Sequence, residues 1–306
     1  MGSLDPRVHV GTVNLRVSDL DSLDFYSGVL GLLVMTQNSA GVTLSADGRR
    51  PLLLLQLKQG LSPPPPGATG LFHTAIRYPT RAALADALRR IDEADLRLDG
   101  ASDHGVSEAL YLTDPAGAGV ELYWDRPREA WPRPSEGRVA MFTEPLDLSD
   151  LLAQADPAAD LVGPVDPAVE VGHVHLKVSD VERSERFYSE VVGLDVTERT
   201  GEEAAFLSAG GYHHHIGMNV WHSRGGPPPP PGTTGLGGFT LAFPDEEALG
   251  TAVERIRATG AAELVEFDDG AVLLHDPDAI AVELGVERSR AQPRGLQSQA
   301  DRSAAE

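Results

Sequence analysis

The chain has 306 residues, and this length predicts about two domains of ~150 residues each. It contains no cysteine, which excludes disulfide scaffolds, thiolate metal sites and cysteine nucleophiles. Its 46 acidic and 25 basic residues give a net charge of −21, so binding to nucleic acid or to anionic membrane surfaces is disfavoured. The sequence contains neither an apolar run long enough to span a membrane nor a secretory signal, and we expect a cytoplasmic protein.

The first 126 residues contain the same order of elements twice, namely a strand, a helix and further strands. Alternation with period 2 predicts the strands, and apolar spacing with period 3.6 predicts the helices. In chain order we expect a strand at 8–17, a helix at 19–30, two strands within 42–57, a strand at 72–78, a helix at 81–94, and strands near 109–113 and 119–123.

The second half of the chain repeats the first half at a spacing of 161 or 162 residues. The matching segments are Gly-Thr-Val-Asn-Leu-Arg-Val-Ser-Asp at 11–19 with Gly-His-Val-His-Leu-Lys-Val-Ser-Asp at 172–180, Phe-Tyr-Ser at 25–27 and 187–189, Asp-Pro at 114–115 and 276–277, and Glu-Leu at 121–122 and 283–284. Such agreement at a constant spacing indicates a tandem duplication. Proline runs at corresponding places, 63–66 and 227–231, indicate stiff spacers.

We therefore predict an α+β fold with four tandem βαβββ modules, paired into two curled-sheet half-domains. The first and second modules form an N-terminal domain at residues 1–126, and the third and fourth form a C-terminal domain at 169–287 that carries the site. A linker at 127–168, rich in Pro, Asp and Glu, joins them and contains a short helix near 148–155. A disordered tail is expected at 288–306, where apolar residues are few.

This pattern resembles the vicinal oxygen chelate superfamily of glyoxalases, bleomycin-resistance proteins and dioxygenases, and within it the two-domain type I extradiol (catechol 2,3-dioxygenase-like) proteins. The resemblance is carried by the segment at 172–180, by Gly-Gly-Tyr-His-His-His-Ile-Gly at 210–217, and by the Asp-Pro and Glu-Leu pairs of the second half. It implies a non-haem metal oxidoreductase that acts on a small aromatic or vicinal-oxygen substrate. It also implies one Fe(II) or Mn(II) ion in the C-terminal domain. Self-association into a homo-oligomer is common in this architecture.

The family holds its metal with two histidines and one glutamate on one face, which leaves positions for a bidentate substrate and O2. Carried over to this sequence, the resemblance assigns His173 and Glu283 as ligands, but the middle position falls on Gly238, which cannot ligate. Strand alternation places His275 on the same face as Leu273, so His275 is the first candidate for a third ligand and His214 is the second. Otherwise two protein ligands and water hold the metal weakly, or no metal binds.

The resemblance also assigns His214 as the acid–base histidine of the C-terminal site. Alternation along the first strand of the third module places His175 on the face of His173, and we expect His175, Gly238 and Leu273 to face the substrate. By the same reasoning, His213 and His215 face away from His214.

The first half has the opposite defect. His73 and Glu121 occupy the middle and carboxylate positions of a ligand set, but Thr12 stands where the first histidine is expected. His104 and Tyr111 fall where the groups around an active site would lie. Neither half contains an intact triad, and we expect His73, Glu121 and Tyr111 to be structural.

Three classes of function remain open at this stage. The first is a metal-dependent dioxygenase-like enzyme, with chemistry changed by the loss of the middle histidine. The second is a metal-independent isomerase, lyase or cyclase that uses His214 as acid–base group with Glu283 or His275. The third is a protein that sequesters a small aromatic molecule without transforming it.

Overall fold

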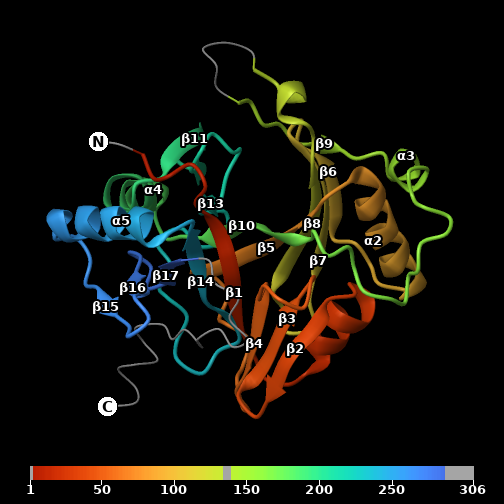
Figure 1. The fold of residues 1–306 in the computed structure, drawn as a ribbon, viewed down its shortest axis with the longest axis horizontal. Coiled ribbons are helices and arrows are strands. Elements are labelled where there is room, and N and C mark those ends of the chain that lie inside the picture. The colour runs from red at the N-terminus through yellow and green to blue at the C-terminus, as the bar shows by residue number, and fades with distance from the viewer. Residues whose placement is uncertain (1–2, 134–138, 287–306) are drawn as a thin grey trace.

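The computed structural model describes residues 3–133 and 139–286, and it contains two large mixed sheets with helices packed against them (Figure 1). Four βαβββ modules follow one another along the chain, as the duplication predicts. The α+β class and the two curled sheets are therefore confirmed. The tail expected at 288–306 lies outside the described residues.

The elements have the following bounds. The first module contains β1 (His9–Val17), α1 (Asp21–Leu23), the π-helix η1 (Asp24–Val29), β2 (Leu33–Asn38), β3 (Gly41–Ser45) and β4 (Leu53–Leu57). The second contains β5 (Gly70–Tyr78), α2 (Arg81–Glu93), β6 (Gly100–Asp103), β7 (Ser107–Thr113) and β8 (Gly119–Asp125). The third contains β10 (Glu170–Lys177), α4 (Val181–Arg186), the π-helix η3 (Phe187–Val192), β11 (Asp195–Thr200), β12 (Ala204–Ser208) and β13 (Ile216–Asn219). The fourth contains β14 (Gly235–Phe243), α5 (Glu246–Thr259), β15 (Val265–Glu266), β16 (Val272–His275) and β17 (Ala281–Val286).

Each module has the same internal strand order, in which the first strand pairs in parallel with the last. The helix after the first strand makes this possible, since parallel neighbours need a long crossover connection. The two longest helices, α2 and α5, begin where the sequence supplies a capping oxygen. The side chain of Thr80 accepts a hydrogen bond from the backbone N–H of Ala83 at the start of α2, and Asp245 accepts one from Ala248 at the start of α5.

The modules pair across the two halves of the duplication, and the expected pairing within each half is wrong. In the eight-stranded sheet β1 of the first module lies antiparallel to β14 of the fourth module. In the nine-stranded sheet β5 of the second module lies antiparallel to β10 of the third. Each sheet therefore contains one module from each half, while the limits at 1–126 and 169–287 remain a prediction about sequence units.

The proline-rich connections explain how consecutive modules reach different sheets. Proline lacks a backbone N–H and cannot continue a strand ladder, so each run at 63–66 and 227–231 carries the chain out of one sheet and into the other. The two connections lie side by side. The backbone N–H of Ser62 donates to Gly232, that of Thr234 donates to Ser62, and that of Thr69 donates to Pro227, with N···O distances of 2.9 to 3.1 Å.

Two equivalent buried hydrogen bonds hold consecutive modules together. The Tyr26 hydroxyl of the first module donates to the Asp114 carboxylate of the second at 3.2 Å. The Tyr188 hydroxyl of the third module donates to Asp276 of the fourth at 3.0 Å. These are the tyrosines and aspartates of the repeated Phe-Tyr-Ser and Asp-Pro motifs. The sheets join the first module to the fourth and the second to the third. The two hydrogen bonds join the first module to the second and the third to the fourth, so each module contacts two others.

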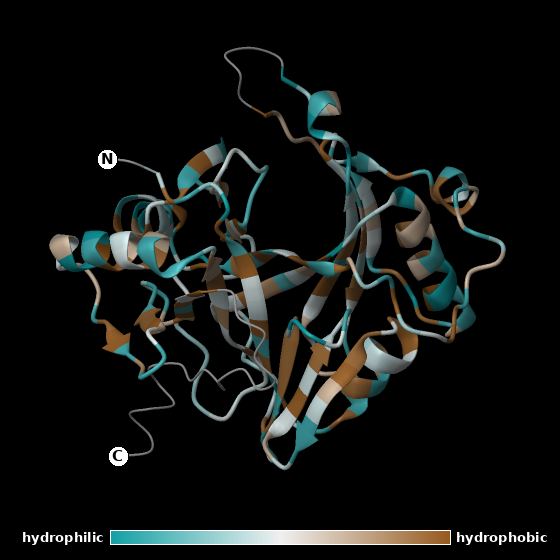
Figure 2. Cartoon of the chain, viewed as in Figure 1, coloured by the Kyte–Doolittle hydropathy of each residue, from teal (hydrophilic) through white to brown (hydrophobic). Residues whose placement is uncertain are grey.

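The hydrophobic core follows the strands of both sheets, which are predominantly apolar in Figure 2, whereas α2 and α5 carry hydrophilic bands. The helices α2 and α5 lie on opposite sides of the molecule in Figure 1. Within the described parts of the chain, no helix combines the length and the apolar character needed to cross a membrane.

The linker between the second and third modules packs along α2. It contains η2 (Arg128–Ala130), a two-residue strand β9 (Glu144–Pro145) that pairs with β6, and α3 (Leu148–Leu152), which matches the helix expected near 148–155. The largely buried guanidinium of Arg90 on α2 donates to the backbone oxygens of Asp160 and Gly163. The linker therefore contributes structure beside the nine-stranded sheet, including a short strand that its composition does not predict.

Gly172 provides a test of the packing beside the site. A Cβ atom at this position would lie 1.7 Å from the Tyr123 hydroxyl, which hydrogen-bonds the Tyr212 hydroxyl at 2.7 Å. We expect Gly172→Ala to lower the free energy of unfolding by about 1–3 kcal/mol, as overpacked core substitutions do. In the Gly172→Ala/Tyr123→Phe double variant the loss should be less than additive, because the overlapping oxygen is gone. Urea unfolding of the four proteins measures this coupling, and strictly additive losses would contradict it.

Candidate active site

Three neighbouring strands of the nine-stranded sheet carry the site. In the register of the sheet, His173 on β10 is the partner of Ala75 on β5, and Ala75 is the partner of Glu121 on β8. His73 lies two residues before Ala75, on the same face of β5. The small side chain of Ala75 leaves the space between its neighbours open, so the three polar side chains converge above it.

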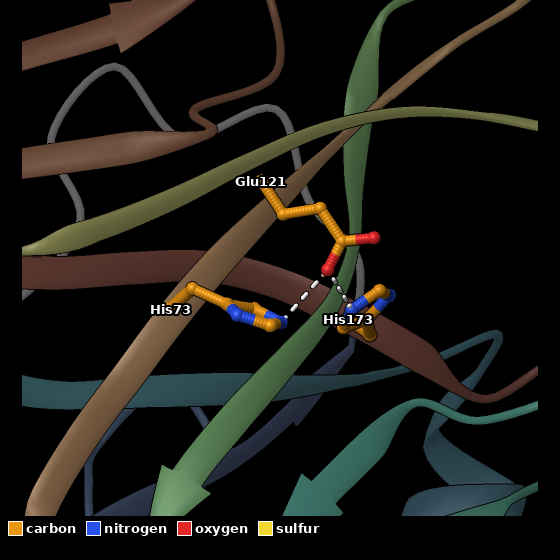
Figure 3. A group of neighbouring side chains, drawn as sticks. All are labelled: His73, Glu121 and His173. Atoms are coloured by element: carbon orange, nitrogen blue, oxygen red, sulfur yellow. Dashed lines mark hydrogen bonds and ion pairs between the residues drawn. The ribbon is translucent and has the colours of Figure 1, made fainter. Parts of the chain in front are cut away.

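His73, Glu121 and His173 form the one group of potential metal ligands found among the described residues, with all ligand atoms within 4.8 Å of one another. Figure 3 shows the Glu121 carboxylate reaching toward both imidazoles. Its Oε2 atom lies 2.8 Å from His73 Nε2 and 3.1 Å from His173 Nε2. All three residues are at most 5% exposed, and a carboxylate so deeply buried is stable only when it is paired or metal-bound.

The charges of this group depend on each other. Burial by itself raises the pKa of Glu121, but the adjacent His173 and His73 lower it well below its usual value. Burial lowers the pKa of His173 to about 4, although Glu121 opposes this shift. At neutral pH the group therefore offers one carboxylate and a neutral imidazole at His173, which is the protonation state that metal ligation requires.

The donor set fits a divalent first-row metal. Two imidazoles and one carboxylate on one side of a centre form the facial arrangement typical of non-haem Fe(II) sites. His73 Nε2 is buried and, despite its short distance to Glu121, has no hydrogen bond of acceptable geometry within the described structure. A buried imidazole nitrogen that has no hydrogen bond and lies close to a carboxylate is typical of a metal ligand in a site without its metal. These three residues would therefore hold Fe(II) or Mn(II).

The group opens into a cavity of about 440 Å³, within the range of ~300–1,000 Å³ typical of small-molecule sites. Strands of the second and third modules form most of its wall. The linker contributes Met141, Phe142 and Thr143. Most of the cavity surface is apolar, and Phe72, Phe206 and Trp221 contribute to it.

Tyr111 and His104 line the cavity beside Glu121. Tyr111 on β7 is the cross-strand partner of Glu121, and its hydroxyl lies 2.7 Å from His104 Nε2. His104 Nδ1 donates to the carbonyl oxygen of Phe142 at 2.8 Å, so in the neutral imidazole Nε2 accepts from Tyr111. Burial, and then the Glu121 charge, raises the pKa of Tyr111 well above 10. Tyr111 therefore stays a neutral hydroxyl beside the ligands.

His214 also lines the cavity, as the sequence led us to expect, and its ring lies 4.0 Å from that of His173 between centroids. Burial, and then the neighbouring His173 and His213, keep the pKa of His214 well below its ordinary value, so the ring is neutral. The expectation that His213 faces away is wrong. Residues 209–215 form an irregular loop between β12 and β13, where strand alternation does not apply, and His213 Nδ1 lies 2.8 Å from His214 Nδ1.

His175 lies in the cavity wall, on the face of β10 that carries His173. The side-chain amide of Asn219 donates to His175 Nε2 at 3.0 Å. Gly217 makes room for this ring, because a Cβ atom there would lie 3.0 Å from it. A direct contact of His175 with substrate stays a prediction.

The other assigned residues of the second half lie elsewhere. Glu283 on β17, Gly238 on β14, and Leu273 and His275 on β16 all belong to the eight-stranded sheet, and none of them lines the cavity. The assignment of Glu283 and His275 as ligands beside His173 is therefore wrong, and so is that of Gly238 and Leu273 as cavity residues. The physical reason is the exchange of modules, which separates the fourth module from the third.

The eight-stranded sheet contains the equivalent of the site without its histidines. Thr240 on β14 is the partner of Glu283, as Ala75 is of Glu121, and Asn14 is the partner of Gly238, as His175 is of His73. Thr12 stands in place of the first histidine. The structure thus places His73 and Glu121 in the candidate ligand group and Tyr111 in the cavity wall, and their functional role stays a proposal. The first half lacks only the first histidine of a ligand set, and the second half lacks only the middle histidine. This complementarity was the signal in the sequence that could have predicted a site shared by the two halves.

The chain belongs to the Glyoxalase/Bleomycin resistance protein/Dioxygenase superfamily, whose family model matches residues 9–122 and 170–284. These two matches cover the two halves of the duplication. The resemblance drawn from the sequence motifs is thereby confirmed at the level of the superfamily.

The chain is 39% identical over 280 residues to catechol-2,3-dioxygenase of Bacillus subtilis (strain 168). The matched region covers 90% of this chain and 96% of that protein. It is also 29% identical over 153 residues to biphenyl-2,3-diol 1,2-dioxygenase 3 of Rhodococcus globerulus, over 49% of this chain and 73% of the relative.

Two solved structures show the same fold. A putative dioxygenase from Bacillus subtilis superposes with a TM-score of 0.63 at 14% identity, covering 94% of this chain and 86% of that one. Glyoxalase I from Zea mays superposes with a TM-score of 0.54 at 16% identity, covering 90% of this chain and 92% of its own.

The ligand assignment predicts different outcomes for two equivalent glutamates. Glu121→Gln removes a charged ligand and should weaken Mn(II) or Fe(II) binding by more than about 100-fold, since even residues that only support ligands cost 10–100-fold. Glu283→Gln, at the same position of the other sheet, should bind metal as the wild type does. Equilibrium dialysis with metal analysis measures both. Equal losses in the two variants, or retained binding in Glu121→Gln, would contradict the assignment.

Proposed function

We propose that this protein is a metal-dependent extradiol dioxygenase that cleaves the ring of catechol-like substrates. One observation carries the proposal: His173 of one half joins His73 and Glu121 of the other half beside a cavity of about 440 Å³. The similarity to a catechol-2,3-dioxygenase over nearly the whole chain supports the same class of reaction. A changed chemistry was expected only because a ligand was missing, and His73 removes that reason.

The reaction inserts both atoms of O2 into a vicinal diol. The carbon–carbon bond between a hydroxylated carbon and its neighbour without a hydroxyl group breaks. In the product the first of these carbons is a carboxylate and the second is an aldehyde. The chemistry that Fe(II) or Mn(II) supplies when bound is chelation of the two substrate oxygens and activation of O2. The protein supplies the ligands, a cavity with a largely apolar surface and groups that handle protons.

Two residues have positions suited to those protons. Neutral His214, whose ring contacts that of His173 at a tilt of 50°, accepts a proton from a substrate hydroxyl and returns it to an oxygen atom derived from O2. The Tyr111 hydroxyl lies beside Glu121 and donates its hydrogen to His104, so its oxygen accepts a hydrogen bond from a substrate hydroxyl. The apolar wall keeps bulk water away from these groups and strengthens their interactions.

The alternative functions leave this arrangement unexplained. A metal-independent isomerase, lyase or cyclase has no need of two histidines that converge on a buried glutamate. A protein that only sequesters an aromatic molecule has no need of a proton-accepting histidine beside them. A cytoplasmic location and a homo-oligomeric state stay predictions.

The test is ring cleavage itself. Protein loaded anaerobically with Fe(II) and then given catechol and O2 should form a product heavier than catechol by one O2 molecule. His214→Gln should lower kcat by about 10²- to 10⁴-fold, the usual contribution of acid–base catalysis, whereas the exposed His222→Gln is the matched control and should not. Turnover in excess chelator would instead support the metal-independent enzyme, and tight binding without product would support sequestration.

The charge of the cavity wall narrows the substrate class. The wall contains Glu198 in addition to Glu121, and no lysine or arginine among the described residues that form it. Glu198 accepts a hydrogen bond from the backbone N–H of Met141 at 3.1 Å, and burial raises its pKa. A carboxylate on the substrate would be repelled by this negative charge, whereas a neutral or ammonium-bearing side chain would not be repelled. Catechols without a carboxylate are therefore the favoured substrates.

Substrates of similar shape and different charge check this preference. We expect kcat/KM for 4-ethylcatechol and 4-(2-aminoethyl)catechol to exceed that for 3,4-dihydroxyphenylacetate by about tenfold or more, which is about 1.4 kcal/mol of discrimination. Glu198→Gln keeps an oxygen for the Met141 N–H but loses the charge, so it should reduce the difference. Equal kcat/KM values for the three substrates, or an unchanged preference in Glu198→Gln, would refute the role of Glu198.

A further inference from the structure

A buried chain of three side chains leads away from the cavity behind His214. His213 Nδ1 lies 2.8 Å from His214 Nδ1, and His213 Nε2 lies 2.8 Å from the Asp125 carboxylate oxygen Oδ1. The other oxygen of Asp125 accepts hydrogen bonds from the Tyr212 hydroxyl at 2.8 Å and from Arg77 at 3.0 Å. Apart from His214, these residues are neither candidate metal ligands nor part of the cavity wall.

The chemistry of the donors and acceptors fixes the direction of the hydrogen bonds. An ionised carboxylate can only accept, so the neutral imidazole of His213 carries its hydrogen on Nε2 and presents a lone pair on Nδ1. His214 must then donate from its own Nδ1, and its Nε2 keeps a free lone pair. Among the described residues no group hydrogen-bonds His214 Nε2, and His214 lines the cavity.

The surroundings hold this chain in place. His213 is 1% exposed, and the rings of Tyr212 and Trp131 lie 4.1 and 5.4 Å from it between centroids, so water does not compete for its nitrogens. Burial by itself raises the pKa of Asp125, but His213 and Arg77 lower it, which keeps the carboxylate ionised. Asp125 lies four residues after Glu121 on β8 and so on the same face of that strand.

We propose that His213 and Asp125 are positioning residues that fix His214 as the tautomer with hydrogen on Nδ1 and a free Nε2 directed to the substrate. This inference rests on the proposed ring cleavage for its functional meaning, but the tautomer itself is a property of the chain alone. A neutral imidazole without such a partner exchanges between two tautomers, and only the one with a free Nε2 accepts a proton at that atom.

The first experiment reads the tautomer in the metal-free protein. Nitrogen NMR of protein labelled with 15N-histidine distinguishes protonated from unprotonated ring nitrogens, and the missing signal in His214→Gln assigns the ring. We expect hydrogen on Nδ1 of His214 in the wild type. In His213→Gln the amide oxygen accepts from His214 and the amide NH2 donates to Asp125, so the tautomer should be retained. In His213→Phe, which has a similar size and no acceptor, the two tautomers should become mixed.

A second variant keeps the proposal testable where His213→Phe fails to fold. In Asp125→Asn the amide oxygen faces the two donors, Arg77 and Tyr212, and the NH2 group faces His213 Nε2. This reverses the chain, and His214 should then carry its hydrogen on Nε2. An unchanged His214 tautomer in both His213→Phe and Asp125→Asn would overturn the proposal.

The second experiment measures catalysis in the Fe(II)-loaded protein. We expect kcat for catechol to fall by about tenfold or more in His213→Phe and Asp125→Asn, with KM and metal affinity unchanged, and His213→Gln to stay near the wild type. A matching fall in His213→Gln, or a parallel loss of metal binding, would indicate a merely structural role and contradict the proposal. A wild type that cleaves no catechol would refute the proposed function, while the NMR result would still decide the tautomer.

Discussion

The register of β10, β5 and β8 is the constraint on which the site depends. It places His173, Ala75 and Glu121 in one row across three strands, with His73 on the face of Ala75. A shift of one residue between any two of these strands would turn a ligand to the opposite face of the sheet. The antiparallel contact between β5 and β10 joins the two halves of the duplication, so the site exists only because these halves exchange modules.

The two sheets share the framework residues of the duplicated unit but differ in their candidate metal ligands. Both keep a glutamate at the same position of the last strand, Glu121 and Glu283, and both keep the bond between a buried tyrosine and the aspartate of the Asp-Pro motif. Only the nine-stranded sheet keeps the histidines. The eight-stranded sheet has Thr12 and Gly238 in their places, so it retains the framework of the fold without a ligand set.

Much of the fold could be predicted from the sequence, because its signals are local. Period-2 alternation located β1 and β5, and helical spacing located α2. Which module pairs with which was not readable, since all first strands have similar apolar patterns and each could pair with any other. The incomplete triads were read as defects of separate domains, whereas the missing pieces lay in the opposite halves.

The histidine loop shows a second limit of sequence reasoning. Alternation predicted opposite directions for His213 and His214, but Gly210 and Gly211 both have positive φ values, at 62° and 66°, and the chain leaves the strand there. Only the structure shows that two consecutive histidines contact each other and that Asp125 supports them from another module.

The exchange of modules also bears on how such a chain tolerates being divided. A polypeptide ending before β10 retains His73 and Glu121, and one beginning there retains His173, so neither fragment contains the full coordination set. Each half therefore depends on the other for the complete set, and a division of the chain in the linker separates the three candidate ligands.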